Sequence, residues 1–398
     1  MYIWSCARLR AERAKRSNSL KTRRREVTAH RVIHGSITNT VENSAPIRCV
    51  ILRKMSSVNL IGFSPAELED LAVELGASPY RGRQLAAWLY RKNVFDLEAM
   101  SNLPQEFRAA LAERAVIELP AVDAVTPSLD GSRKIVLRLA AEGRISAVLM
   151  PDDDRLTLCL STQVGCGYKC GFCLTGTMGL ERNLTAAEIV GQLLVANLLA
   201  APARVTHMVF MGMGEPLANL KPVVAAIRIF TDARLGLGYS PRRITVSTVG
   251  LVSGIEHLAR EDLKVNLAIS LHAPSDEVRS RLMPVNKSWN LEALMAAVKR
   301  YPLQPRQRVF FEYVMLHEVN DSQEDARRLA RLLRGVRAKV NLIPFNDWAG
   351  SAFHRPPLPT ILKFQSILLE AGVTTTVRWS KGEDIGAACG QLKEPVSA

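Results

Sequence analysis

The chain has 398 residues, of which 47% are hydrophobic and 23% are charged, and its formal net charge is +14. This length and composition are those of a globular protein that can bury a sizeable core, in one large domain and a smaller one. No stretch of eighteen uninterrupted apolar residues occurs, which argues against a membrane-spanning helix, so we expect no membrane partner.

Most of the charge lies in the N-terminal extension, residues 1–54, which hold 13 Lys or Arg against 3 Asp or Glu and leave only +4 for the rest. This extension has no sustained hydrophobic period and lacks the apolar segment of a secretory signal. Three interpretations stay open: a disordered arm that attracts RNA, an organelle transit peptide, or translated sequence upstream of the true start. Globular patterning begins abruptly at Met55, which favours the last. The mildly basic remainder is compatible with RNA binding without demonstrating it.

Seven cysteines are present, at positions Cys6, Cys49, Cys159, Cys166, Cys170, Cys173 and Cys389. They are sparse, unevenly spaced and odd in number, which argues against an extracellular disulfide framework. A reducing compartment is the better setting, where clustered cysteines bind metal or do chemistry. We therefore expect a cytoplasmic protein.

A small helical domain is predicted over residues 55–118. Ser64 and Pro65 form a helix start, and Glu67 and Glu69 fall near the positive end of the helix dipole. Helical apolar spacing continues through RGRQLAAWLYRK and LPQEFRAALAERA. From Lys134 the pattern changes to short apolar strands in KIVLRLA, RISAVLMP and LTLCLST, so residues 119–155 are assigned to a β-rich extension.

Strand and helix patterns then alternate through the main domain, residues 156–393. The predicted strands are Val205–Met211, Arg243–Val249, Lys264–Leu271, Arg308–Leu316, Lys339–Ile343 and Thr374–Trp379. The predicted helices between them include Thr185–Leu199, Leu220–Thr231, Leu291–Tyr301 and Ser322–Leu333. Such alternation predicts parallel βαβ units of an α/β fold, with a sheet covered on both faces. Chemistry is then expected at the carboxyl ends of the strands.

Three cysteines with C-x3-C-x2-C spacing, Cys166, Cys170 and Cys173, lie in a glycine-rich loop after a strand and before a helix. Thiolates are soft ligands that suit iron–sulfur clusters and zinc. A closed structural zinc site needs four ligands, and the fourth is missing locally. Three thiolates on a four-iron cluster leave one iron open to an external ligand. A zinc site completed by a distant residue and three core cysteines are the alternatives, but the strand–loop–helix context and glycine spacing favour the cluster.

This spacing resembles the signature of the radical S-adenosylmethionine (SAM) superfamily. The resemblance implies a partial (β/α) barrel of the TIM type, a [4Fe-4S] cluster, and SAM bound through its methionyl part to the open iron. One electron from the cluster then cleaves the sulfonium to give a 5′-deoxyadenosyl radical. In such enzymes the protein positions the cofactor and the substrate and tunes their reactivity, while the cluster and the cofactor carry out the difficult chemistry.

Polar residues follow several predicted strands and form a candidate cofactor site. Gly214 and Glu215 begin a GEP sequence that suits an α-amino group and resembles the superfamily's glycine–glutamate–proline motif, although alone it is also a common turn. Ser247 and Ser270 offer hydroxyls for a carboxylate or ribose. The assignment of His272 as a cofactor contact depends mainly on its motif, because a lone histidine more often has a structural role. The remaining candidate is Asn346, an amide able to read adenine or ribose beyond the strand in NLIPFN.

Two further cysteines stand apart from the cluster. Cys159 lies seven residues before Cys166, on or near a strand, where a small buried hydrophobe is the plain alternative. Cys389 lies in SKGEDIGAACGQL, a polar, glycine-spaced segment that packing explains less easily. A thiol there can swing into a cleft and act as a nucleophile.

With these residues, the chain resembles the dual-specificity RNA methyltransferase family, from about Asn59 to Lys393. The resemblance is carried by YRGRQLAAWLYRK, DDRLTLCLSTQVGC, GFCLTGTMGLERNLTAAEI, MGMGEPL, ISLHAP and EDIGAACGQL. It implies methylation of adenine C2 in 23S rRNA and in some tRNAs, with two SAM molecules per turnover. It also implies a one-electron donor such as flavodoxin or ferredoxin, and a monomer.

The resemblance further implies residue roles. Cys389 is first methylated, loses hydrogen from its S-methyl group, and adds the resulting methylene to C2. Cys159 then attacks Cys389 and releases the product as a transient disulfide forms. The implied cofactor contacts are Gly214, Glu215, Ser247, Ser270, Leu271, His272 and Asn346.

One position departs from the family pattern. The family commonly has a glutamate, assigned as the base for the C2 proton, where this chain has Ser146. A serine hydroxyl is a poor base, so another group such as Glu142, water or a thiolate takes the proton, or turnover is impaired. No residue is assigned to this role.

Alternative functions stay open at this point. One is methylation of C8 of the same adenine; another is a radical maturase that acts on a protein and needs neither Cys159 nor Cys389. A third is a zinc-stabilised RNA-binding protein. The helical domain is the expected RNA-docking element, with phosphate-contact candidates Arg81, Arg83, Arg91 and Lys92, although surface charge is their default explanation. Reaching C2 requires the adenine to be unstacked or flipped out.

Overall fold

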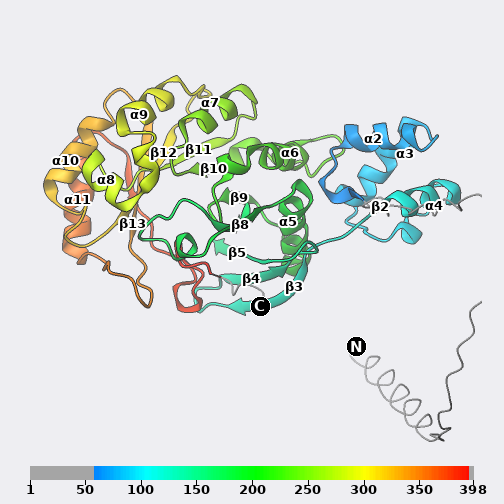
Figure 1. The fold of residues 1–398 in the computed structure, drawn as a ribbon, viewed down its shortest axis with the longest axis horizontal. Helices are drawn as coiled ribbons and strands as arrows, with labels where there is room; N and C mark the ends of the chain where they lie inside the picture. Colours follow the sequence, from blue (N-terminus) through cyan, green and yellow to red (C-terminus); the bar gives the residue numbers. More distant parts are fainter. Residues whose placement is uncertain (1–57, 394–398) are drawn as a thin grey trace, which may run out of the picture. The chain divides into compact units, whose positions relative to one another are not determined.

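The computed structural model describes residues 58–393, and the N-terminal extension discussed above lies outside that range. Among the described residues, no helix combines the length and apolar character needed to cross a bilayer. The described chain forms a group of short helices at its N-terminal end, followed by a large sheet with its covering helices (Figure 1).

The helical group contains the helices that the sequence predicted. Its elements are β1 (Val58–Asn59), η1 (Leu60–Gly62), α2 (Pro65–Glu74), α3 (Pro79–Ala86), the π-helical turn η2 (Ala87–Arg91), η3 (Leu97–Ala99), α4 (Gln105–Arg114) and β2 (Ala115–Val116). Ser64 caps α2 through a reciprocal capping box with Glu67, as the helix start predicted. The buried Tyr90 hydroxyl donates to the carbonyl of Ile61 over 2.7 Å, which ties η2 to η1.

A ten-stranded sheet dominates the rest, in the order β14-β13-β12-β11-β10-β9-β6-β5-β4-β3. Its antiparallel part is β3 (Ala121–Pro127), β4 (Arg133–Arg138), β5 (Arg144–Asp152) and β6 (Arg155–Cys159). Its other strands are β9 (His207–Phe210), β10 (Ile244–Thr248), β11 (Asn266–Ser270), β12 (Val309–Met315), β13 (Ala338–Pro344) and β14 (Thr375–Val377). Strand β6 pairs parallel to β9, and all pairs from there to β14 are parallel. Since β3 and β14 are the two edges, the sheet stays open, which agrees with the predicted partial barrel.

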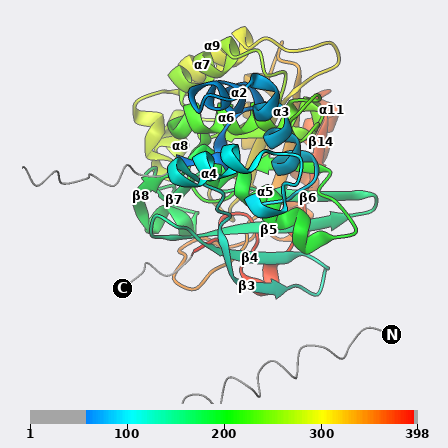
Figure 2. The same cartoon turned by 90° about the vertical axis from the view of Figure 1, so that its right-hand side faces the viewer.

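Helices connect the parallel strands and cover the outer face of the sheet (Figures 1 and 2). They are α5 (Ala186–Ala200), α6 (Leu220–Thr231), α7 (Val252–Arg260), α8 (Asp276–Leu282), α9 (Leu291–Arg300), α10 (Gln323–Leu332) and α11 (Leu358–Glu370). Each predicted strand and helix of this region is present, and α6 has the predicted bounds. Helices α7, α8 and α11 were not predicted.

The inner face of the sheet carries the polar residues, because side chains alternate between the two faces of a strand. On β12, Phe311 and Tyr313 are buried on the helix side. The alternate residues Phe310, Glu312 and Val314 line cavities on the inner side. The hydrophobic core thus fills the space between sheet and helices, while the inner face is left for the site.

The cysteine loop has a different setting from the one predicted. Strand β7 (Gln163–Cys166) leads into it, but an antiparallel partner, β8 (Gly179–Asn183), follows before helix α5. The loop is therefore the connection of a β-hairpin, not a direct strand-to-helix turn. The 3-10 turn η4 (Leu174–Thr177) completes it.

Candidate active site

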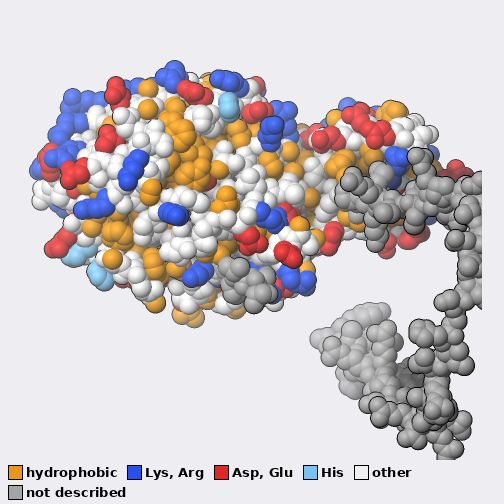
Figure 3. Space-filling view, in the orientation of Figure 1, with side chains coloured by type: hydrophobic (Ala, Val, Ile, Leu, Met, Phe, Trp, Pro, Cys, Tyr) orange, Lys and Arg blue, Asp and Glu red, His pale blue; other side chains and the backbone are white. Residues whose placement is uncertain are grey.

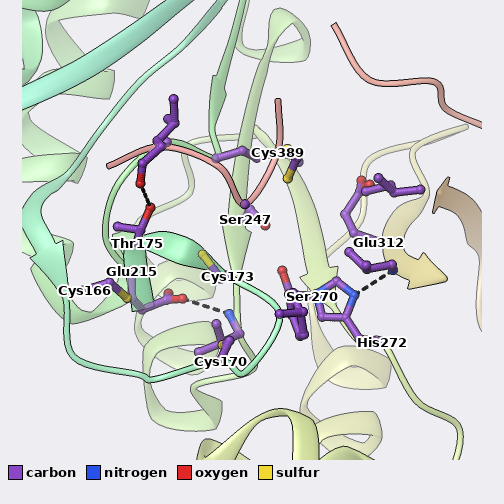
Figure 4. Close-up of a pocket in the computed structure, with 18 of the residues that line it drawn as sticks. Cys166, Cys170, Cys173, Thr175, Glu215, Ser247, Ser270, His272, Glu312 and Cys389 are labelled. Atoms are coloured by element: carbon purple, nitrogen blue, oxygen red, sulfur yellow. Dashed lines mark hydrogen bonds between the residues drawn. The ribbon is translucent and has the colours of Figure 1, made fainter. Parts of the chain in front are cut away.

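A pocket at the carboxyl ends of the parallel strands brings most predicted site residues together (Figure 4). Its lining includes Cys166, Cys170, Cys173, Gly214, Glu215, Ser247, Ser270, His272, Asn346 and Cys389. Cys159 lines an adjoining pocket, which also reaches Cys389. Leu271 is the exception: its side chain is fully buried, its N–H donates to the Glu312 carbonyl, and its own carbonyl accepts from Arg279.

The cysteine loop is shaped by backbone constraints. Gly165 has a φ of +75°, and a Cβ there would lie 2.0 Å from the Gly179 carbonyl oxygen, so only glycine fits where β7 meets β8. The N–H of Gly171 donates to the Leu282 carbonyl over 2.9 Å, which ties the loop to the end of α8. These contacts hold the three thiol groups around one side of the pocket.

The three thiols suit a metal centre by their chemistry. Burial raises the pKa of Cys166 to about 11 and also raises the pKa values of Cys170 and Cys173. Thiolates at such a desolvated site need a strong positive charge beside them, which an iron centre supplies. Within residues 58–393, no three His, Cys, Asp or Glu side chains are close enough to hold a single metal ion. All five cysteines of that range are free. Three soft donors on a loop that lines a pocket fit the predicted [4Fe-4S] cluster.

Glu215 is held firmly beside this loop. Its Oε1 accepts the N–H of Leu217 and its Oε2 accepts the N–H of Val249, both over short hydrogen bonds of 2.9 and 2.8 Å. Burial raises the pKa of this carboxyl to about 7, against the effect of those hydrogen bonds. The preceding Gly214 has a φ of +96° and packs against Gln163, where a Cβ would lie 2.5 Å from the glutamine Cβ. The pair can receive a cationic ammonium at a fixed place.

The ends of β10 and β11 are joined by a buried arginine. Arg279 on α8 is fully buried and donates to the carbonyls of Val249, Leu271 and Ser270 and to the side chain of Asn286. It therefore fixes the spacing of the strand ends that carry Ser247 and Ser270. Its burial was not predicted, because neither arginine in SDEVRSRL carries a local sign of burial.

His272 is buried in the left-handed region, with a φ of +58°. Its Nδ1 accepts the N–H of Val314 over 3.0 Å, and its ring lies edge-on to Phe172, 4.6 Å between centroids. Burial, reinforced by the charge of Arg279, lowers the pKa of His272 to about 3. The ring is therefore neutral at physiological pH and presents an Nε2–H donor.

The C-terminal segment that carries Cys389 is tied to the cysteine loop. The N–H of Leu174 donates to the Gly390 carbonyl over 2.7 Å, and the Thr175 hydroxyl donates to the Leu392 carbonyl. Asn346 donates from Nδ2 to the Cys389 carbonyl over 3.1 Å. The segment is thus more ordered than its polar, glycine-spaced sequence indicated. Its other side contacts the β3–β4 turn, where Asp384 accepts from Ser128 and Leu129 (Figure 1).

Cys159 and Cys389 meet in one pocket. Burial raises the pKa of Cys159 to about 12, and desolvation raises that of Cys389 to about 11 although the Cys389 residue is exposed by its accessible surface. The cation of Arg378, which lines the same pocket, opposes both increases. Two thiols that line one pocket and affect each other's ionisation can form and break a disulfide if the segment brings their sulfur atoms into bonding geometry.

Ser146 and Glu312 occupy contrasting positions. Ser146 is fully buried on β5, its carbonyl accepts from the Ser161 hydroxyl, and it lines neither pocket. Glu312 on β12 lines the main pocket, and the sequence analysis missed it. A lone carboxylate within the apolar run VFFEYVM was the signal that could have identified it.

Two family profiles match the chain. One, described as the ribosomal RNA large subunit methyltransferase N-terminal domain, matches residues 58–117. The other, described as the radical SAM superfamily, matches residues 160–330. The first match covers the helical group and the second covers the cysteine loop and most of the parallel strands.

Similar proteins carry consistent names. The dual-specificity RNA methyltransferase RlmN of Syntrophotalea carbinolica is 48% identical over 337 residues, which cover 84% of this chain and 90% of the relative. That of Geotalea uraniireducens is 47% identical over 339 residues, covering 85% and 97%. Among solved structures, a radical SAM methyltransferase from Sphaerobacter thermophilus aligns with a TM-score of 0.80 and 44% identity, covering 84% of this chain and 99% of the other.

Proposed function

The chain belongs to the dual-specificity RNA methyltransferase family of radical SAM enzymes, and on this basis we propose that it methylates C2 of an adenine in 23S rRNA and in some tRNAs. The observation that carries the proposal is the pocket shared by Cys159 and Cys389 beside the cysteine loop. The comparisons support this function and neither the C8 nor the protein-maturase alternative. A maturase or a zinc-stabilised RNA-binding protein has no use for that thiol pair.

Cys166, Cys170 and Cys173 are the residues that would hold the [4Fe-4S] cluster. Glu215 would receive the methionyl ammonium of SAM, and Ser247, Ser270, His272 and Asn346 would contact its carboxylate, ribose or adenine. When bound, the cluster and two SAM molecules per turnover supply a methyl group and, with one electron, a strong hydrogen-atom acceptor. Gly214 lines the same pocket, whereas Leu271 does not.

The two thiols perform the steps that belong to the protein. Cys389 takes the methyl group as a thioether, loses one hydrogen atom from it, and forms the new carbon–carbon bond to adenine C2. The Cys159 thiolate then attacks the Cys389 sulfur, so the S–C bond breaks as the S–S bond forms, and the released carbon gains a proton to become the product methyl group. Reduction of the disulfide completes the cycle.

RNA has two cationic surfaces available. In the helical group, Lys92 lies 3.4 Å above the Trp88 ring, beside the exposed Tyr80, a combination that suits RNA bases and phosphates. Of the other predicted phosphate contacts, Arg83 pairs with Glu69, Arg81 donates to the Asn102 carbonyl, and Arg91 donates to the Ala233 carbonyl. These three arginines therefore stabilise the fold through intramolecular contacts, in addition to any contact with RNA phosphates.

The second cationic surface is an open cavity on the inner face of the sheet. Its basic lining residues are Arg155, Arg242, Arg243, Lys339 and Arg378. Charges of both signs are mixed on the face seen in Figure 3. The cavity also holds both signs, since Asp152 pairs with Arg155 and Glu312 lines it, but its five cations outnumber these two carboxylates. It offers phosphate contacts within reach of the thiol pocket, because Arg378 lines both.

Mass mapping of RNA after reaction tests the proposed function. Anaerobically purified enzyme, loaded with iron and sulfide and supplied with SAM, a reductant and 23S rRNA or tRNA, should yield 2-methyladenosine. Cys389→Ala should yield none. A methyl group at C8, or full activity of Cys389→Ala, would contradict the proposal. We also propose a cytoplasmic monomer that receives electrons from a flavodoxin or ferredoxin.

A further inference from the structure

Glu312 lies at the middle of β12, between the two cavities of the inner face. It pairs with Ser270 of β11 on one side and with Asn341 of β13 on the other. Its side chain lines both the pocket of Cys389 and the open basic cavity. Only 4% of the residue is exposed, so the carboxyl group is buried between two spaces that solvent or substrate can enter.

The two carboxyl oxygens of Glu312 differ in their bonding. Oε1 accepts Nδ2 of Asn341 over 2.8 Å, and the amide is oriented for this because its Oδ1 accepts the Thr376 hydroxyl over 2.9 Å. Oε2 is buried and has no hydrogen-bond partner among the described residues. A buried carboxylate oxygen without a partner is costly, so its presence requires a reason.

The other carboxylate of the pocket is already engaged. Glu215 and Glu312 are the acidic side chains that line it, within the part of the chain that the structure describes. Both oxygens of Glu215 accept backbone N–H groups. Glu312 thus brings to the wall of the pocket a carboxylate oxygen that is buried and has its acceptor capacity unused.

The charges around Glu312 suit a base. Burial raises the pKa of its carboxyl, whereas the cations of Arg378 and Lys339 and the hydrogen bond from Asn341 lower it. Cys389 faces the same carboxyl closely enough that the two groups repel each other when ionised. A poorly solvated carboxylate accepts a proton readily.

The chemistry of the adenine requires such a group. When the new bond to C2 has formed, C2 carries both its original hydrogen and the new carbon. A bound iron–sulfur cluster, which supplies one electron at the start of the reaction, would take one electron back from this adduct. The C2–H bond must then break so that its electron pair restores the aromatic ring. In this adduct C2 is two covalent bonds from the Cys389 sulfur, in the pocket that Glu312 lines.

We propose that Glu312 is the catalytic base of this enzyme, and that its Oε2 accepts the proton that leaves adenine C2. The assignment rests on the proposed function. The C2–H electron pair goes into the ring, the proton goes to the carboxylate, and no further oxidant or reductant is consumed. Ser146 has no carboxylate to offer and lines neither pocket.

Glu312→Gln tests the assignment, because glutamine keeps the shape and the hydrogen bond to Asn341 but cannot take a proton. The reaction uses cluster-loaded enzyme with methylated Cys389 and RNA deuterated at adenine C2. The variant should still cleave SAM once and attach to RNA, but the adduct should keep its deuterium and accumulate. Release of methyladenosine should fall on the order of 100-fold or more, the usual effect of removing a general base. Glu312→Asp should recover part of that release.

One control variant and three possible outcomes make the result decisive. Glu370→Gln, the same substitution on an exposed end of α11, should behave as wild type. Loss of deuterium and product release by Glu312→Gln within threefold of wild type would overturn the assignment. Failure of the variant to methylate Cys389 would also overturn the assignment, since Glu312 would then be needed in a step that precedes the reaction with RNA. If wild-type enzyme forms no methyladenosine and no adduct, the proposed function fails instead.

Discussion

The side chain of Asn346 donates its Nδ2 hydrogen bond to the backbone carbonyl of Cys389 over 3.1 Å. Arg355 orients this amide by donating to its Oδ1 over 3.4 Å. Asn346 is also a proposed SAM contact, so the same side-chain amide would contact both the segment that carries Cys389 and the cofactor. We therefore expect movement of Cys389 and occupation of the cofactor site to be coupled through this amide.

Asn346→Ala should loosen the Cys389 segment and weaken SAM binding together. The lost hydrogen bond contributes about 1 kcal/mol, so the dissociation constant for SAM should rise roughly 5- to 10-fold. Trypsin cleavage at Lys381 should accelerate, because the segment on either side is released. Calorimetry and timed proteolysis measure the two effects. Unchanged cleavage and unchanged affinity would show that the amide does not link them.

Arg279→Met should destabilise the fold strongly. The change leaves the buried carbonyls of Val249, Leu271 and Ser270 without their shared donor. Each unsatisfied buried group costs about 1–3 kcal/mol, and the Leu271 carbonyl keeps the N–H of Ala273 as a donor, so the free energy of unfolding should fall by roughly 2 kcal/mol or more. Denaturant unfolding of the variant measures this. Arg260→Met, on the exposed side of α7, is the control and should change stability by less than about 0.5 kcal/mol; an equal loss in both variants would contradict the role of Arg279.

Arg378→Gln should make both thiols of the shared pocket harder to ionise. The arginine cation lowers the pKa values of Cys159 and Cys389, which burial raises to about 12 and about 11. Without it, the thiolate of Cys389 should form only at higher pH. The rate of Cys389 alkylation by iodoacetamide, followed by mass spectrometry from pH 7 to 10, should shift to higher pH. A shift to lower pH, or none, would remove Arg378 from this role.

A pair of aspartates should make the position of the C-terminal segment depend on pH. Desolvation opposes ionisation of Asp130, but the N–H groups of Ser132 and Gly382 outweigh it and lower its pKa from 3.8 to about 2. Hydrogen bonds from Ser128 and Leu129 lower the pKa of Asp384 as well. Because these pKa values are depressed in the folded protein, the stabilisation is complete above about pH 4 and is lost as the pH falls toward 2.

Asp130→Asn should therefore weaken the hydrogen bond from the Gly382 N–H at neutral pH, as protonation of Asp130 in acid does in the wild-type protein. Amide hydrogen exchange at Gly382 should accelerate in the variant, and the acceleration on going from pH 5 to pH 2.5, corrected for intrinsic rates, should be smaller than in wild type. Asp154→Asn is a matched exposed control on the β5–β6 turn. Equal pH dependence in wild type and Asp130→Asn would contradict the assignment.

Local sequence patterns predicted the elements and the place of the site, since strand and helix periodicities depend on neighbours in the chain. Strand β10 is the predicted strand Arg243–Val249 without its first and last residues, and α6 has the predicted bounds. Strand ends also predicted where Glu215, Ser247 and Ser270 meet. The positions of site residues that belong to short sequence motifs could thus be predicted from the sequence.

Contacts between distant segments were not predictable in this way. The hairpin partner β8 is short and polar, and its pairing with β7 depends on the loop between them. The burial of Arg279 depends on carbonyls of two different strand ends, and the role of Glu312 depends on Asn341 in the next strand and on Cys389 near the C-terminus. The order of the Cys389 segment likewise arises from bonds to the cysteine loop.

The covalent route through the thiol pair is tested most directly by the mass of Cys159→Ala enzyme after reaction with RNA. The variant keeps Cys389 but lacks the thiol that attacks its sulfur, so the protein should remain attached to RNA through Cys389. Denaturing gels and mass spectrometry of digested adduct should show one methylene between Cys389 and the adenine. Free methyladenosine released at the wild-type rate, with no adduct, would contradict the account.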